Sequence, residues 1–213
     1  MNLKKHLDRA EQALERGQAD FAVELCDQVL DFAPGEQRAA ELLVAAAVAM
    51  EGKSGLLKKL GSAPGGLAAK FSKLTRNAEG EARQLRRAFI KDPANTATGL
   101  KWGDALERAG YAGAALGVFG GLAARDGAAA KRAGALAAAQ GEVDAALDYY
   151  QQALDVNPRD TDAMRARKNL AAEQALRQNK YDDDAASGLD SEAFMRAARG
   201  EDVDEPEEGG KEG

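Results

Sequence analysis

Apolar residues recur along most of the chain at intervals of three and four, the spacing that places side chains on one face of an α-helix. No stretch alternates apolar and polar residues as a half-buried β-strand would. Alanine and leucine, which favour helices, dominate the apolar content. The pattern therefore predicts an all-α protein. The expected helices lie near residues 2–16, 18–32, 36–51, 66–77, 79–91, 95–109, 111–124, 128–140, 143–156 and 160–179.

Two segments of the chain repeat one arrangement of small residues and proline. In each, a glycine is followed after five residues by an alanine, after seven more by alanine or valine, and after five more by a proline. The glycine permits a turn between two helices, the small residues allow close helix packing, and the proline ends the second helix. The positions are Gly17, Ala22, Val29 and Pro34 in the first copy and Gly141, Ala146, Ala153 and Pro158 in the second.

Two further copies are less regular. One has a turn glycine at Gly110 and Gly127 where proline would stand, and the other ends at Pro93. Pro93, Gly127 and Pro158 are spaced 34 and 31 residues apart, which is close to the period of about 34 residues in one class of helical repeat. Pro34 and Pro93 are 59 residues apart, so we expect a shortened or distorted unit between them.

These intervals resemble the tetratricopeptide repeat (TPR) family, in which each unit is an antiparallel helix pair. The resemblance implies an α-solenoid of such pairs, ended by a capping helix near residues 160–179. Residues 181–213 have low apolar content and many acids, so we expect a disordered tail. The predicted regions are an N-terminal unit with the following helix (1–51), a basic degenerate repeat (52–94), two units with the capping helix (95–180) and the acidic tail (181–213).

The resemblance also implies a function, because the first helices of TPR units line a groove that holds a peptide or helix of another protein. We therefore expect a non-catalytic protein-protein interaction scaffold. Leu100 and Asp104 stand where members that bind chaperone tails have lysine and asparagine, which argues against a chaperone tail as the ligand. A groove with alanines and few charges suits a ligand with apolar side chains. The groove positions carried over from the family are Leu100, Asp104, Glu107 and Arg108, then Lys131, Ala135 and Ala138, then Arg165 and Asn169.

Charge is unevenly distributed along the chain, although the net charge is only −6. Residues 51–91 carry +7, and residues from Tyr181 onward carry −9. In the basic region, lysines alternate with leucine and phenylalanine at helical spacing, which suits either a packed helix with a solvated lysine face or binding to an anionic partner. An alternative function is therefore a peripheral membrane or nucleic-acid binder that the acidic tail modulates by screening. The basic patch consists of Lys58, Lys59, Lys70 and Lys73.

The sequence offers little for catalysis, a metal or a cofactor, and we expect none of the three. Cys26 is the single cysteine and suits a core position, and His6 is the single histidine and suits either the surface or the packing side of the first helix. The residues Gly52-Lys53-Ser54 resemble the end of a phosphate-binding loop, but Ala47 stands where that motif requires glycine. The N-terminus lacks the apolar core of a secretory signal, so the cytoplasm is the expected location.

The repeat alignment places Ala22 and Ala146 where the two helices of a unit cross. We therefore predict that leucine at Ala146 over-packs the crossing and lowers the free energy of unfolding by about 1–3 kcal/mol. Thermal denaturation of Ala146→Leu checks this prediction, and an unchanged melting temperature would contradict the alignment.

Overall fold

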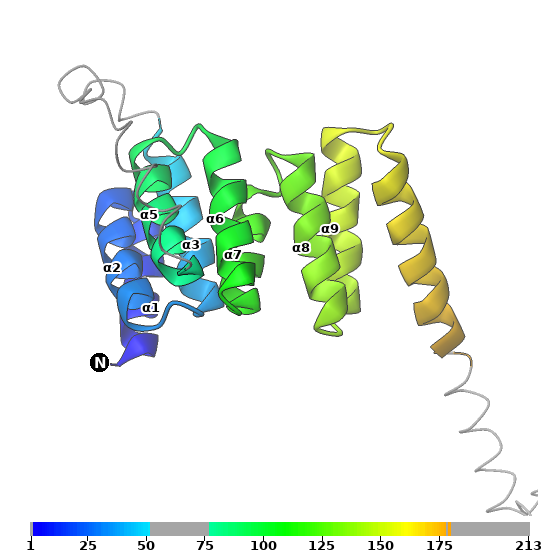
Figure 1. The fold of residues 1–213 in the computed structure, drawn as a ribbon, viewed down its shortest axis with the longest axis horizontal. Coiled ribbons are helices and arrows are strands. Elements are labelled where there is room, and N and C mark those ends of the chain that lie inside the picture. Colours follow the sequence, from blue (N-terminus) through cyan, green and yellow to red (C-terminus); the bar gives the residue numbers. More distant parts are fainter. Residues whose placement is uncertain (1, 52–76, 178, 180–213) are drawn as a thin grey trace, which may run out of the picture. The chain divides into compact units, whose positions relative to one another are not determined.

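The computed structural model describes residues 2–51, 77–177 and 179, and the regular structure within these residues is helical (Figure 1). The chain forms two compact units, Met1–Leu170 and Ala171–Gly213, and all labelled helices belong to the first. Residues 161–177 are also helical. The labelled helices are α1 (Leu3–Glu15), α2 (Ala19–Phe32), α3 (Gln37–Ala49), α5 (Ala78–Lys91), α6 (Thr96–Arg108), α7 (Ala112–Leu122), α8 (Gly127–Ala139) and α9 (Val143–Val156).

These helices confirm the all-α prediction, and the observed ends lie within two residues of the expected ones. The expected helix at residues 66–77 lies outside the described residues except for Asn77, which caps α5 by accepting a hydrogen bond from the Gly80 N–H at 3.3 Å. The predicted basic patch and the acidic tail also lie outside the described residues.

The turns inside the helix pairs depend on glycine, as the repeats predicted. Gly17, Gly110 and Gly141 have φ values of 73°, 84° and 83°, which are strained for other residues. After each glycine, the next residue's N–H reaches back to close a Schellman cap, as in the 2.8 Å bond from Gln18 N to Ala13 O. The same bond runs from Tyr111 N to Leu106 O and from Glu142 N to Ala137 O, each at 2.9 Å. The same glycine-containing Schellman cap therefore ends α1, α6 and α8.

Proline follows three of the second helices, whereas α7 is followed by Gly127 instead. The helices α2, α5 and α9 end two residues before Pro34, Pro93 and Pro158 respectively. Each proline occupies the second position of a turn closed by a backbone hydrogen bond, such as Asn95 N to Asp92 O at 3.1 Å. The residue that closes the turn then precedes the next helix, and Asn95 caps α6 through the Thr98 N–H. The three proline turns are thus structurally equivalent.

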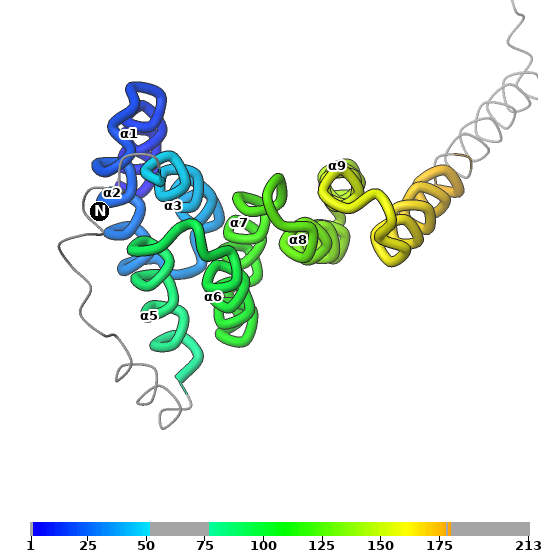
Figure 2. Tube along the Cα trace, turned by 90° about the horizontal axis from the view of Figure 1, so that it is seen from above, coloured from blue at the N-terminus to red at the C-terminus, as the bar shows by residue number. Residues whose placement is uncertain are grey.

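Helices that follow one another pack side by side, and two helices far apart in the sequence, α3 and α7, also pack together. The helix α3 packs against α7 as well as against α2 (Figure 2). Glycines of α7 lie on the side that faces α3. A methyl group at Gly117 would lie 2.3 Å from the carbonyl oxygen of Gln37, and one at Gly121 would lie 2.8 Å from the Cβ of Val44. These glycines therefore let the two helix backbones approach more closely than any side chain permits.

The apolar core continues from this contact into α5 and α6. The rings of Phe89 and Trp102 lie 5.9 Å apart between centroids, and both residues are buried. Cys26 is also buried, which agrees with the packing role predicted for it. Ala22 and Ala146 are completely buried, as expected for small residues at helix crossings.

We predict that Gly117→Ala destabilises the protein by about 1–3 kcal/mol, because the new methyl group would force α7 away from α3. Without that contact, alanine in a helix interior would stabilise by about 0.5–1 kcal/mol. Chemical denaturation measures the free energy of unfolding. Gly80→Ala is the matched control, since its methyl group would meet nothing closer than 3.7 Å. If both variants are stabilised alike, the α3–α7 contact is not tight.

Candidate functional site

One arginine connects α8 to α6, which are the first helices of two successive helix pairs. The Arg132 guanidinium lies 2.8 Å from a carboxylate oxygen of Asp104 and also hydrogen-bonds Glu107, and both acids belong to α6. The same guanidinium lies over the Phe119 ring, 5.3 Å from its centroid. All three charged side chains retain substantial solvent exposure. We call this surface, with the exposed side of α8, the α6–α8 face.

Small residues line the exposed side of α8. Ala128, Ala135 and Ala139 are exposed and follow the helical spacing of Arg132, so the four side chains form one strip along the helix. Ala138, the other alanine expected in the groove, is partly buried against the core. Methyl side chains project little from a helix, so another chain can approach this strip closely. The strip is therefore apolar except at Arg132, which pairs with the acids of α6.

Two neighbouring ion pairs extend this arrangement. Arg108 of α6 lies 2.9 Å from a carboxylate oxygen of Glu81 in α5. Lys131 of α8 lies 2.8 Å from a carboxylate oxygen of Asp160. Asp160 also accepts a 3.0 Å hydrogen bond from the Ala163 N–H at the start of the next helical segment. The hydrogen bond from Lys131, followed by that from Ala163, lowers the pKa of Asp160.

The structure therefore divides the sequence-predicted groove residues into four groups. Asp104 and Glu107 come together around Arg132, whereas Arg108 and Lys131 pair with acids on other segments. Leu100 is partly buried against the core. Arg165 and Asn169 are exposed, and neither side chain has a hydrogen-bond or ion-pair partner among residues 2–51 and 77–177.

Sequence reasoning missed both Arg132 and a buried arginine, Arg86. Only 4% of Arg86 is exposed, and its Nε lies 2.7 Å from Oδ1 of Asp27 while its Nη2 hydrogen-bonds Asp31. The Nε–H does not point at Asp27, so that contact is an ion pair without a hydrogen bond. Arg86 lies between Ala82 and Phe89 on the buried side of α5. Its place in this apolar pattern is the sequence feature that could have identified it as a buried arginine. The arginine fastens α5 to α2.

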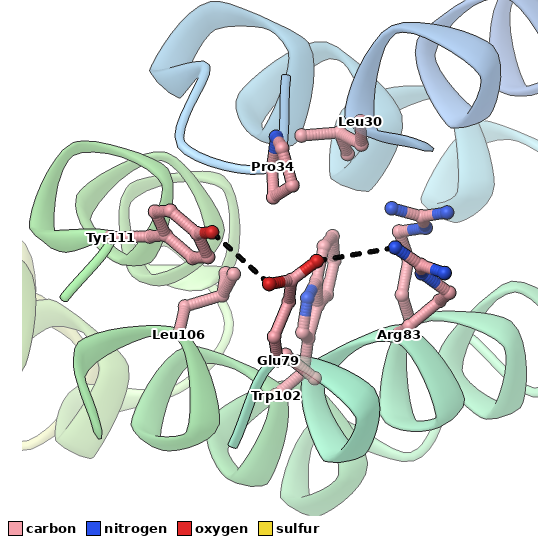
Figure 3. Close-up of a pocket in the computed structure, with 9 residues that line it drawn as sticks. Leu30, Pro34, Glu79, Arg83, Trp102, Leu106 and Tyr111 are labelled. Atoms are coloured by element: carbon pink, nitrogen blue, oxygen red, sulfur yellow. Dashed lines mark hydrogen bonds and ion pairs between the residues drawn. The ribbon is translucent and has the colours of Figure 1, made fainter. Parts of the chain in front are cut away.

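A small pocket lies beside this ion pair, between α2, α5 and α6 (Figure 3). The Tyr111 hydroxyl donates to Glu79 at 3.3 Å, and Glu79 pairs with Arg83 of the same helix at 3.2 Å. The space inside is about 10 Å³, enough for about one water molecule, whereas organic ligands occupy pockets of about 300–1,000 Å³. The pocket is thus too small for a metabolite. Its lining is Leu30, Pro34, Glu79, Ala82, Arg83, Arg86, Trp102, Leu106 and Tyr111.

The described residues contain little reactive chemistry. Burial, and then the nearby Asp27 carboxylate, raise the pKa of the Cys26 thiol to about 12, so the thiolate needed of a nucleophile does not form near neutral pH. His6 lies on α1, and its Nδ1 is 3.0 Å from the Asn2 carbonyl oxygen. Within residues 2–51 and 77–177, no group of three His, Cys, Asp or Glu side chains is placed to hold a metal ion. Among the described helices, none has the length and apolarity needed to cross a membrane.

Neither a protein-family model nor a curated protein matches this chain. Among solved structures, it is similar to "Crystal structure of MamA protein", with 16% identity, a TM-score of 0.41, and coverage of 96% of this chain and 98% of that one. It is also similar to "MamA MSR-1 C2" (18% identity, TM-score 0.38, 90% and 98% covered) and to a mutant of MamA (19%, 0.37, 81% and 88%). Identities and TM-scores at this level assign neither a family nor a function to the chain.

We predict that Arg86→Ala lowers the free energy of unfolding by about 3 kcal/mol, because it leaves Asp27 without its partner, leaves Asp31 only the more distant Arg83, and empties a packed site. Arg86→Met should cost less, since an apolar side chain of similar length refills the site. Denaturant titration compares these variants with Arg87→Ala, whose exposed side chain should contribute within about 0.5 kcal/mol. Equal losses for Arg86→Ala and Arg87→Ala would show that the buried ion pair is unimportant.

Proposed function

We propose that this protein is a non-catalytic scaffold that binds a peptide or helix of another protein on the α6–α8 face. One observation carries the proposal: Arg132 bridges α8 to Asp104 and Glu107 of α6 beside an exposed strip of alanines. The bridge links two successive first helices, and such helices line the groove in the TPR family that the repeats resemble. A ligand chain on the α6–α8 face can thus contact both helices.

The exposed alanines of the face favour a ligand with apolar side chains. Ala135 and Ala139 present methyl groups to solvent, and a partner side chain seated there would bury apolar area on both molecules. Arg132, Asp104 and Glu107 already pair with one another. They therefore form a polar margin and do not require a charged ligand. Interfaces of this kind combine an apolar centre with a polar rim.

Arg165 and Asn169 supply further polar groups on the helical residues 161–177, which we call the capping segment. Both are exposed and have side chains free of partners among the residues that the structure describes. They can hydrogen-bond the carbonyl groups or a carboxylate of a bound chain, which would fix its direction. Lys131 is held by Asp160, so we assign it to positioning the capping segment rather than to direct binding.

The salt dependence of binding distinguishes this proposal from the alternative that the sequence suggested, in which the basic patch binds a membrane or nucleic acid. Charge-driven binding falls steeply as ionic strength rises, whereas binding to a mainly apolar strip persists. The scaffold proposal therefore expects partners to remain bound at high salt.

We predict that Ala135→Arg removes the partners that the wild-type protein retains from native lysate, because the long charged side chain covers the strip. For a retained protein obtained in pure form, the dissociation constant should rise about tenfold or more. Titration calorimetry at low and high salt measures this change.

Ala88→Arg is the matched control, since Ala88 is an exposed helical alanine on α5. Both variants should unfold at the wild-type temperature. The proposal fails if Ala135→Arg and Ala88→Arg retain the same proteins as the wild type.

A further inference from the structure

The outer side of α2 exposes two phenylalanines. Phe32 is 66% exposed and Phe21 is 46% exposed, in a protein that has six phenylalanines. They are eleven residues apart, which is about three helical turns, so both side chains lie on one side of α2 about 16 Å apart along its axis. Leaving two aromatic rings in water forgoes the stabilisation that burial of each would provide. Phe21 and Phe32 therefore form a pair of separate apolar anchors.

Acidic side chains lie next to these rings. Asp20 and Glu24 are exposed, fall within about 120° of arc of the phenylalanines, and have no ion-pair partner among residues 2–51 and 77–177. Asp27 and Asp31 differ, because Arg86 and Arg83 neutralise them. The uncompensated carboxylates therefore stand beside the aromatic rings. We call Asp20, Phe21, Glu24 and Phe32 the α2 strip.

Comparison with α9 shows which feature of the α2 strip is special. The repeat alignment matches Asp20 with Asp144, Glu24 with Asp148, Phe21 with Ala145 and Phe32 with Val156. The carboxylates are thus common to both second helices, whereas the aromatic rings at these two positions belong to α2. Solubility accounts for acids on either helix but not for the exposed phenylalanine pair.

We propose that the α2 strip binds a basic amphipathic helix of another protein. A helix lying along α2 presents apolar side chains at intervals of three and four residues to Phe21 and Phe32, and places lysine or arginine beside Asp20 and Glu24. A cation can also lie over the exposed phenylalanine rings. The carboxylates repel nucleic acids, anionic membranes and acidic peptides. This surface is separate from the α6–α8 face, so either proposal can fail without the other.

A model peptide tests the proposal without knowledge of the natural partner. The probe is a fluorescent helix of about 18 residues, about five helical turns, with leucine on one side and lysine on the other, and its binding to the full chain is followed by anisotropy. We expect Phe21→Ala/Phe32→Val, which gives α2 the residues of α9, to raise the dissociation constant about tenfold or more. Glu24→Lys should raise it about threefold to tenfold through charge repulsion.

The repeat supplies matched controls, because Asp148→Lys and Val156→Ser change the equivalent exposed positions on α9. Both should leave the dissociation constant within about twofold of wild type. A second probe with glutamate in place of lysine should not bind. All substituted side chains are exposed, so the melting temperature measured by circular dichroism should match that of the wild type. If the double variant does not fold, Glu24→Lys still tests the proposal.

Four results would overturn the proposal. The first is equal binding of the lysine probe by wild type and Phe21→Ala/Phe32→Val, and the second is equal binding of the glutamate probe. The third is a dimer in sedimentation that the double variant dissociates, because a second copy would then cover the strip. The fourth is tighter probe binding after Lys58, Lys59, Lys70 and Lys73 are changed to glutamine, because the protein's own basic segment would then be the occupant.

Discussion

The close approach of α3 to α7 is the constraint on which the rest of the first unit depends. Neighbouring helices are joined by short turns, but nothing in the chain sequence alone brings residues near 40 beside residues near 117. Gly117 makes this possible, since any side chain there would collide with the Gln37 carbonyl group. The contact joins α1–α3 to the helices from α5 onward, and Arg86 adds a second connection from α5 to Asp27 and Asp31 of α2.

Arginines connect first helices by one recurring arrangement. Arg38 of α3 pairs with Asp8 and Glu11 of α1, and Arg132 of α8 pairs in the same way with two acids three residues apart on α6. Exposed ion pairs contribute about 0–1 kcal/mol each, so these bridges add little to stability. Their effect is geometric, because a forked guanidinium held by two carboxylates fixes the lateral distance between helices. Arg86 differs in energy, since burial removes most of its hydration.

The two proposed binding surfaces follow from the two kinds of helix in the repeat. First helices meet through charged bridges and expose small residues such as Ala135, which suits an apolar segment lying across them. The second helix α2 exposes large rings and carboxylates, which suits a cationic amphipathic helix. The two proposals assign different ligands to the two surfaces, so together they expect one molecule to hold two different partners at once. Such division of surfaces is what a scaffold requires.

The sequence by itself determined the helices, their ends and the turn types, because each depends on residues only a few positions apart. Gly17, Gly110 and Gly141 satisfy a positive φ at their turns, and a proline cannot continue the helix before it. The small residues at Ala22 and Ala146 likewise predicted burial correctly.

Only the tertiary structure decided which charged residues pair and which remain free. Arg132 lies 25 and 28 residues from its acids and Arg86 lies 55 from Asp31, so no local pattern could match them. For this reason the sequence suggested Asp104 as a groove residue and passed over the exposure of Phe32. The free energy of pairing and burial depends on distances in space, which the fold sets through contacts such as that of Gly117 with α3.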